Sequence, residues 1–368
     1  MKIILDRKAF NEAITHVARA VSTKSTIPAL EGIMILTEEE RIKLVSYNLE
    51  IGMTTTLDAR IMESGEIIIN AHLLCDIVRR LPGEEVTLSV DEKNICHIES
   101  GSAKFDIMGM DTSEFPEIPS LSESKRLELS GETLKSMVRQ TIFAVAVSDA
   151  KPVHTGILFD MKDGILRLVA VDGFRLAVRE ENVASQETIK FIATGSAVGE
   201  AIKIISDEEE PVVINVGRRH ISFEIGNFIL ISRLLDGEFI DYENTVPKVF
   251  ASTVRVDTRN LIDTVERISL VINDRLKSPL RCNIKDDIMD ISCVTSMGKA
   301  EDYCAINLDG APIEIGFNNK YLLDALRAAE TDEVLLEFNG SFAPMIVKPV
   351  SGTAFTFMVM PMRLKNEG

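Results

Sequence analysis

The chain has 368 residues, of which 45% are hydrophobic and 26% charged, enough for two or three domains with ordinary cores. This composition excludes intrinsic disorder, and no uncharged apolar run reaches the 18 residues of a membrane-spanning helix. Asp6 and Arg7 come too early for a secretory signal peptide, so we expect a cytoplasmic protein. The net charge of −17, taken for the whole chain, argues against binding to nucleic acid.

The cysteines and histidines give no sign of a disulfide framework or a metal site. The five cysteines are an odd and scattered set without a C-x-x-C pair, and the five histidines stand far apart. We therefore expect no metal. The cysteines are Cys75, Cys96, Cys282, Cys293 and Cys304.

An amphipathic helix is predicted three times along the chain. In the window 7–21, apolar residues recur with 4-3-4 spacing, which puts them on one face of a helix. The same spacing recurs in 131–145 and 258–272, at successive offsets of 124 and 127 residues. Two helices of this kind could match by chance, so a second repeated element is needed to establish an internal repeat.

A second helix repeats at the same interval. The windows 72–81, 196–206 and 318–329 align at an apolar residue, and an acidic residue follows two positions later in each. Both offsets are 124 residues. The aligned apolar residues are Leu74, Val198 and Leu322, and the acidic residues are Asp76, Glu200 and Asp324.

Hairpins are predicted between the helices. Two apolar runs flank a polar turn in 31–48, 155–172 and 280–296, and further strand pairs follow each second helix. Each unit is thus helix, strands, helix, strands. Pro- and Ser-containing segments at 114–125 and 244–252 mark the boundaries. The predicted domains are 1–120, 126–246 and 250–368.

Charge is distributed unevenly over this repeat. The six helix windows hold 12 Lys and Arg against 7 Asp and Glu, whereas the rest of the chain holds 28 against 50. Chance variation over short windows is one explanation. The other is a helical surface that faces a polyanion while the strands and loops repel it.

Several motifs, in order, resemble the bacterial sliding clamp, the beta subunit of DNA polymerase III. They are STIPALEGI (25–33), EFPEIP (114–119), LVAVDGFRLAVR (168–179), SRLLDGEFIDYENTVP (232–247) and MVMPMRL (358–364). The resemblance runs over the whole chain. It implies an α+β fold of three DNA-clamp (processivity-fold) domains, with helices inside and antiparallel sheets outside a ring-shaped homodimer. It also implies a non-catalytic subunit of a DNA-directed DNA polymerase holoenzyme, a nucleotidyltransferase.

The geometry of helix packing agrees with a dimeric ring. Helices side by side lie about 8–10 Å apart, so six would leave a hole of about 7 Å and twelve a hole of about 24 Å. Only twelve helices, from two chains, could surround duplex DNA. The dimer residues implied by family position are Phe105 and Ile107 on one side and Leu270 and Val271 on the other.

A ring that slides over any sequence needs only phosphate contacts from basic residues. By resemblance, Lys24 and His72 lie where the family has basic lining residues. Further candidates follow from helix and loop position, although each could equally belong to an ordinary solvated face: Arg79, Arg80, Arg139, Lys151, Lys203, Arg275 and Lys277.

The resemblance also implies a hydrophobic groove between the second and third domains. There the replicative polymerase catalytic subunit, the clamp loader and other proteins with a clamp-binding motif would insert a short peptide. Taken alone, MVMPM favours a core strand, whereas the resemblance favours a groove wall, with Arg175 and Arg363 at the rim. The matching residues are His154, Val171, Gly173, Phe174, Arg175, Leu176, Ile240, Thr245, Met358, Met360, Pro361, Met362 and Arg363.

Enzymatic signatures are weak. The sequence D-G-F-R is not accompanied by a kinase catalytic loop, GKA at 298–300 lacks the rest of a P-loop, and there is no H-E-x-x-H. We expect no catalytic residue and no cofactor. Two alternatives stay open at this stage: a peptide-binding scaffold protein without a DNA-encircling role, and an enzyme on a triplicated fold.

Overall fold

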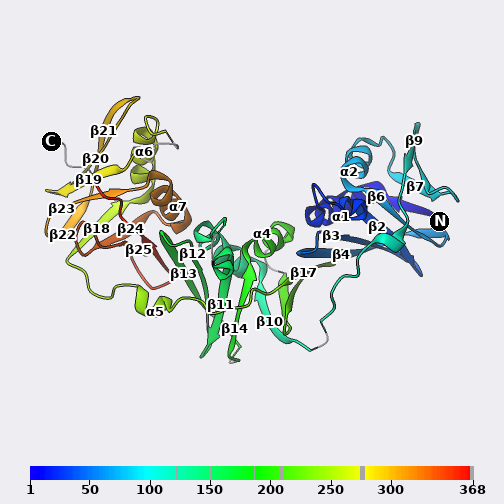
Figure 1. The fold of residues 1–368 in the computed structure, drawn as a ribbon, viewed down its shortest axis with the longest axis horizontal. Coiled ribbons are helices and arrows are strands. Elements are labelled where there is room, and N and C mark those ends of the chain that lie inside the picture. The colour runs from blue at the N-terminus through cyan, green and yellow to red at the C-terminus, as the bar shows by residue number, and fades with distance from the viewer. Residues whose placement is uncertain (122, 149–150, 186, 207–209, 274–277, 365–368) are drawn as a thin grey trace. The chain divides into compact units, whose positions relative to one another are not determined.

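The computed structural model describes residues 1–121, 123–148, 151–185, 187–206, 210–273 and 278–364 (Figure 1). The chain forms two compact units. The first contains Met1–Leu134 and Ser196–Leu234, and the second contains Lys135–Gly195 and Leu235–Gly368. Among the described residues, no helix has the length and apolar character needed to cross a membrane.

The first unit contains a five-stranded sheet, β5-β1-β7-β8-β9, and an eight-stranded sheet, β10-β15-β16-β17-β4-β3-β2-β6. Their strands are β1 (Lys2–Asp6), β2 (Gly32–Glu38), β3 (Arg41–Tyr47), β4 (Ile51–Asp58), β5 (Arg60–Glu63), β6 (Glu66–Asn70), β7 (Glu85–Val90), β8 (Ile95–Ser100), β9 (Ala103–Met108), β10 (Lys125–Ser130), β15 (Pro211–Val216), β16 (His220–Ile225) and β17 (Phe228–Arg233). The helices are α1 (Arg7–Val17), α2 (Ala71–Arg80) and α4 (Gly195–Ile204), with 3-10 turns η1 (Ala18–Ala20), η2 (Pro28–Glu31) and η3 (Thr112–Glu114). Helix α3 (Gly131–Arg139) crosses from the first unit into the second.

The second unit contains a nine-stranded sheet, β14-β11-β12-β13-β26-β25-β24-β18-β22, and a four-stranded sheet, β21-β20-β19-β23. Their strands are β11 (Gly156–Lys162), β12 (Ile165–Val171), β13 (Arg175–Asn182), β14 (Ile189–Thr194), β18 (Ser252–Asp257), β19 (Leu280–Lys285), β20 (Ile288–Thr295), β21 (Gly298–Ala305), β22 (Asn307–Gly310), β23 (Ile313–Phe317), β24 (Glu333–Phe338), β25 (Met345–Pro349) and β26 (Phe355–Val359). The helices are α5 (Tyr242–Thr245), α6 (Thr258–Ser269) and α7 (Asn319–Ala329), with 3-10 turns η4 (Ile142–Ala144) and η5 (Pro152–Thr155).

The repeated helices begin at repeated capping residues. The side chains of Asp6, Ser130 and Asp257 each accept a hydrogen bond from the backbone N–H three residues later, at the start of α1, α3 and α6. Asn70 and Asn318 cap α2 and α7 in the same way. A side-chain oxygen at this position satisfies one of the N–H groups that a helix start leaves unpaired. The internal repeat therefore extends to the residues that fix where these five helices begin.

The predicted helices and hairpins are confirmed, but the first helix of each repeat is shorter than its window. Helix α1 ends at Val17 and continues as η1, α3 ends at Arg139 and is followed by η4, and α6 ends at Ser269. The last apolar residue of the first window, Val21, still reaches the core from an extended segment. Apolar spacing identifies the residues that pack inward. It does not show where the helix ends, because the turn after the helix continues the same spacing.

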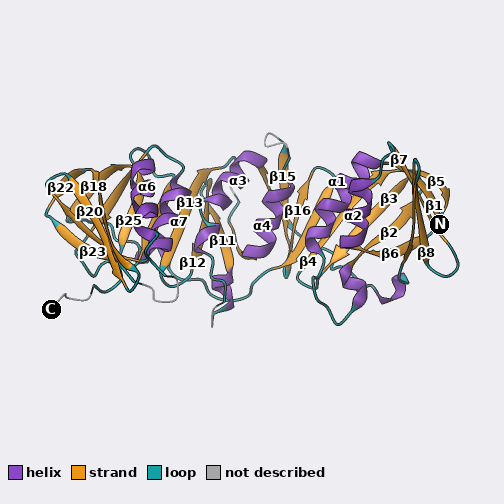
Figure 2. Cartoon of the chain, turned by 90° about the horizontal axis from the view of Figure 1, so that it is seen from above, coloured by secondary structure: helices purple, strands orange, loops and turns teal. Residues whose placement is uncertain are grey.

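Within each unit, two helices lie side by side over the strands (Figure 2). Helices α1 and α2 pack against each other, and α6 packs against α7. Their inner faces carry the buried residues that the spacing predicted, such as Ile14 and Leu74 in the first unit and Leu322 in the second. An ion pair of 2.7 Å from Arg327 to Glu266 joins α7 to α6 at the surface.

The compact units do not follow the predicted domains, because the middle repeat is divided between them. Strands β10 and β15–β17 extend the first unit through the pairing of β17 with β4. Strands β11–β14 extend the second unit through the pairing of β13 with β26. We call these the first and second junctions. The predicted boundaries of the three domains stay predictions.

Candidate functional site

An apolar cluster lies at the second junction, where β11, β12, β13, β25 and β26 meet the linker that contains α5. We call it the second-junction cluster. Its buried members are Val153, Leu158, Val169, Val171, Leu176, Ile192, Tyr242, Ile346 and Met358. Half-buried residues pack against them: Val178, Leu235, Phe239, Ile240, Val246, Phe250 and Met360. Five of the predicted groove residues are therefore brought together, along a rim of apolar side chains that are only partly covered.

Tyr242 fastens the linker to this cluster. Its hydroxyl donates a hydrogen bond of 3.1 Å to the Asp160 carboxylate on β11, which also pairs with Lys190 at 3.1 Å. Burial, and then the neighbouring Asp160 carboxylate, raises the pKa of Tyr242. The hydroxyl therefore stays protonated at neutral pH and continues to donate.

The C-terminal segment runs past the cluster and is fixed at two points after β26. The N–H of Met360 donates to the Phe174 carbonyl at 2.8 Å, and the N–H of Met362 donates to the Gly316 carbonyl at 2.7 Å. A Cβ at position 316 would lie 2.6 Å from the Met362 carbonyl oxygen, so this close approach requires glycine. The core-strand interpretation of MVMPM holds for Met358 and Val359, which are buried in β26. The residues after Val359 run beside the cluster, and their role as a groove wall stays a prediction.

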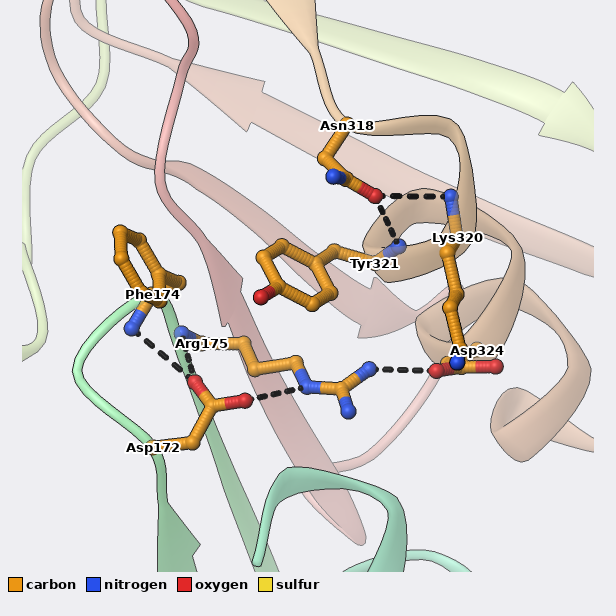
Figure 3. Close-up of polar contacts among 7 residues, drawn as sticks. All are labelled: Asp172, Phe174, Arg175, Asn318, Lys320, Tyr321 and Asp324. Carbon is orange, nitrogen blue, oxygen red and sulfur yellow. Dashed lines mark hydrogen bonds and ion pairs between the residues drawn. The ribbon is translucent and has the colours of Figure 1, made fainter. Parts of the chain in front are cut away.

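The structure corrects the prediction that Arg175 stands at an exposed rim. Its side chain is only 10% exposed and pairs with Asp172 at 2.9 Å and with Asp324 of α7 (Figure 3). The guanidinium also lies 4.6 Å from the centre of the Tyr321 ring. A planar guanidinium with carboxylates on two sides and an aromatic face beside it is well suited to a fixed internal position. Arg175 therefore ties β13 to α7.

Phe174 is the most exposed of the predicted apolar groove residues, with 58% of its surface accessible. Its ring stacks on Tyr321 at a centroid distance of 5.8 Å (Figure 3). Asn318 accepts hydrogen bonds from the N–H groups of Lys320 and Tyr321, and so sets where α7 starts. The pair Phe174 and Tyr321 thus forms an aromatic surface beside the C-terminal segment.

Tyr321 and Asp324 were missed as site residues by the sequence analysis. The signal for Asp324 was present, because the second helix of every repeat carries an acid at this position. In each repeat that acid has a basic partner. Asp76 pairs with Arg79 and Arg80, Glu200 with Arg19 and Lys203, and Asp324 with Arg175.

The remaining predicted groove residues differ in exposure. Leu176 is fully buried, which corrects the expectation that it offers surface to a ligand. His154 is 7% exposed, and its ring meets Phe239 edge to face at 6.2 Å. Gly173 has φ +85°, which suits glycine in the turn before Phe174. Thr245 and Arg363 are exposed, and Pro361 and Met362 are half-buried.

The predicted DNA-facing residues that the structure describes are all exposed: Lys24, His72, Arg79, Arg80, Arg139, Lys151 and Lys203. Three of them pair with an acidic residue on their own helix. Asp76 lies 2.5 Å from Arg79 and 2.9 Å from Arg80, and Glu200 lies 2.7 Å from Lys203. The hydrogen bond with Arg80 holds the pKa of Asp76 below its ordinary value, so this acid is ionised at neutral pH. Arg275 and Lys277 lie outside the described residues.

The predicted dimer residues lie at or near two sheet edges. Strand β9 is the edge of the five-stranded sheet, where Phe105 is 39% exposed, Ile107 is half-buried and Met108 is 71% exposed. Strand β21 is an edge of the four-stranded sheet. Leu270, just after α6, is 82% exposed, and Val271 beside it is half-buried. Exposed edge strands with apolar side chains are suited to pairing with another chain.

Among the residues that the structure describes, no group of three His, Cys, Asp or Glu side chains is arranged so that it could hold a metal ion. All five cysteines are free thiols. Burial raises the pKa of Cys75 and of Cys304 to about 11, which keeps both thiols protonated and unreactive near neutral pH.

Family models match three successive segments of the chain. They describe the N-terminal, central and C-terminal domains of the DNA polymerase III beta subunit, and match residues 1–119, 128–241 and 243–363. Among curated relatives, the beta sliding clamp of Staphylococcus aureus strain Mu50 is 31% identical, over 99% of both chains. The beta sliding clamp of Halalkalibacterium halodurans is 29% identical, over 99% of this chain and 100% of its own.

Solved structures agree. A putative DNA polymerase III beta subunit from Eubacterium rectale has a TM-score of 0.93 at 33% identity, covering 98% of this chain and 99% of that one. The sliding clamp of Bacillus subtilis has a TM-score of 0.94 at 26% identity, covering 99% and 100%. The fold and these comparisons define a sliding clamp, a processivity factor of DNA polymerase. The chain belongs to the family of bacterial DNA polymerase III beta subunits. This membership does not favour the alternative of a scaffold protein without a DNA-encircling role.

Proposed function

We propose that two copies of this chain join head to tail into a closed ring that encircles duplex DNA in the cytoplasm and tethers a replicative polymerase to it. The observation that carries the proposal is the threefold repeat of helices and sheets, matched by sliding clamps over nearly the whole chain. The three domains would be 1–120, 126–246 and 250–368. In this role the chain is a non-catalytic subunit, because its part is to hold the polymerase and the DNA together.

The ring would close through the sheet edges at β9 and β21. Each is an edge strand. A head-to-tail contact joins two different surfaces, so two copies form a closed ring only if the rotation from one copy to the next is a half turn. Phe105 and Ile107 of one copy would meet Leu270 and Val271 of the other. Light scattering at micromolar concentration should give twice the chain mass, and a monomer would contradict the proposal.

The contacts with DNA would be few, basic and directed at phosphates. The first candidates are the exposed residues Lys24, His72, Arg139 and Lys151. Arg275 and Lys277 are further candidates. Arg79, Arg80 and Lys203 would act with part of their charge already offset by Asp76 and Glu200. Affinity for a linear duplex should therefore be weak and fall steeply as salt rises.

The polymerase, the clamp loader and other proteins with a clamp-binding motif would dock at the second junction. The supporting features are the half-buried rim of the second-junction cluster, the exposed Phe174 ring on Tyr321, and the C-terminal segment from Met360 to Arg363. Methionine side chains adapt their shape to different peptides, which suits a site with several partners. A clamp of this family from Pseudomonas aeruginosa has been solved with griselimycin bound.

A further inference from the structure

We propose that the first junction carries a second peptide-binding groove, which takes a short extended segment with an apolar anchor flanked by Lys or Arg. The groove has a volume of about 690 Å³ and lies on the outer face of β2, β3, β4 and β17, beside the linker that follows η3. We call it the first-junction groove. The lining residues used below are Val45, Phe115, Glu117, Ile118, Glu224 and Ile229.

The first-junction groove is the repeat counterpart of the second-junction cluster. Adding 124 residues converts Val45 into Val169, Phe115 into Phe239 and Ile118 into Tyr242, all of which belong to that cluster. The strand pairing agrees as well, since β4 pairs with β17 at the first junction as β13 pairs with β26 at the second. One backbone design is therefore present twice in the chain, each time with apolar residues on its outer face.

The linker over the first junction is fastened less firmly. At the second junction, the Tyr242 hydroxyl bonds to Asp160. Their counterparts at the first junction are Ile118 and Leu36, which cannot form that hydrogen bond. Phe115 and Ile118 remain half-buried, and Ile229 opposite them is 44% exposed. These three apolar side chains are therefore accessible to a ligand.

Charge around the groove selects the ligand. Its charged lining residues are Glu117, Glu224 and Lys43, and Lys43 already faces Glu38 at 3.9 Å. Both glutamates are exposed, and Glu224 accepts a hydrogen bond of 2.7 Å from Asn215. The surroundings are thus net negative, so Lys or Arg beside an apolar anchor is favoured and acidic flanks are repelled. A buried apolar anchor supplies most of the affinity of a short peptide.

The test is photo-crosslinking with a defined probe, a decapeptide that carries a central Leu and p-benzoylphenylalanine between lysines. Mass spectrometry of the full-length protein locates the crosslinked residues. We expect adducts in 34–54, 115–121 or 224–231, at least tenfold fewer with Glu in place of the lysines in the probe. Adducts confined to the second junction, or equal yields from both probes, would overturn the proposal without affecting the proposed clamp function.

Three variants, one of them a matched control, make the test specific. Ile229→Glu should reduce the adducts at the first junction at least tenfold, while the matched surface change Phe342→Glu, at a site 81% exposed, should leave them unchanged. Glu117→Lys with Glu224→Lys should reverse the preference, so that the glutamate-flanked probe crosslinks better, which a folding defect would not produce. If instead Ile229→Glu abolishes self-association seen by light scattering, the occupant is a second copy of the chain and the peptide assignment is wrong.

Discussion

The two junctions repeat one backbone and differ in what their side chains do. At the first, the Asn48 side chain accepts hydrogen bonds from the N–H groups of Glu50 and Ile51. At the second, Asp172 accepts from Phe174 and Arg175 at the same positions, 124 residues later. The residue between is left-handed in both turns, with φ +74° at Leu49 and +85° at Gly173. The backbone turn is part of the repeated fold, because it is present at both junctions although the side chains around it differ.

The side chains of the two junctions differ first in charge. The second junction has Asp172 where the first has the neutral Asn48, and Arg175 where the first has Ile51. Asp172 can therefore both make the turn and pair with Arg175. Arg175 in turn reaches Asp324 of α7 and brings the Tyr321 ring beside Phe174. The first junction lacks this network, since Ile51 has no charge. We infer that the network distinguishes the proposed docking site at the second junction from its repeat at the first.

The largest effect is expected from removing residues 360–368. This deletes Met360 and both backbone hydrogen bonds that fix the C-terminal segment, while the proposed dimer residues lie elsewhere. Binding of a Gln- and Leu/Phe-containing peptide, followed by fluorescence polarisation, should be abolished, and the dimer should persist. Tight binding by the truncated protein would mean that the groove is misplaced, and loss of the dimer would mean that the segment is structural core.

Leu176→Ala should be the most destabilising single change at the second junction. The side chain is fully buried, so its removal leaves a cavity and should lower the free energy of unfolding by about 2–5 kcal/mol. The control is Leu49→Ala at the first junction, where the side chain is 45% exposed and the change should be within about 0.5 kcal/mol. Urea unfolding of both variants measures the difference, and equal losses would contradict the burial argument.

Asp172→Asn tests the network directly, because asparagine already makes the equivalent turn at Asn48. The turn should survive, while the buried Arg175 loses one partner, at a cost of about 1–3 kcal/mol in the free energy of unfolding. The reverse change, Asn48→Asp, gains no arginine partner and should have little effect. Combining Asp172→Asn with Asp324→Asn should give a non-additive result, and strict additivity would show that the two carboxylates act independently.

Apart from the control changes, Gly52→Ala should have the smallest effect. Position 52 is the counterpart of Leu176, and a Cβ there would lie 3.0 Å from the Ile231 Cγ2 and 3.2 Å from the Ile118 Cγ2. The two isoleucines must shift slightly, which should cost about 1 kcal/mol in the free energy of unfolding. Thermal unfolding gives the value. An unchanged or higher stability would show that the linker at the first junction moves aside freely.

The repeat, the six helices and the hairpins could be predicted from the sequence because their apolar spacing is local and periodic. The joining of β4 to β17 and of β13 to β26 could not, since pairing between distant strands leaves no periodic signal. The error at Arg175 has a similar cause. An arginine next to an exposed Phe174 is typical of a rim, and only the fold brings Asp324 close enough to bury it.

Retention on circular and cut templates shows whether the protein is a closed ring that slides on DNA. The protein is loaded onto a nicked circular plasmid by a clamp loader, separated from free protein by gel filtration, and the plasmid is then cut once with a restriction enzyme. A closed ring should elute with the circle and be released when the circle is cut. Equal retention on both templates, or a footprint at one sequence, would contradict it.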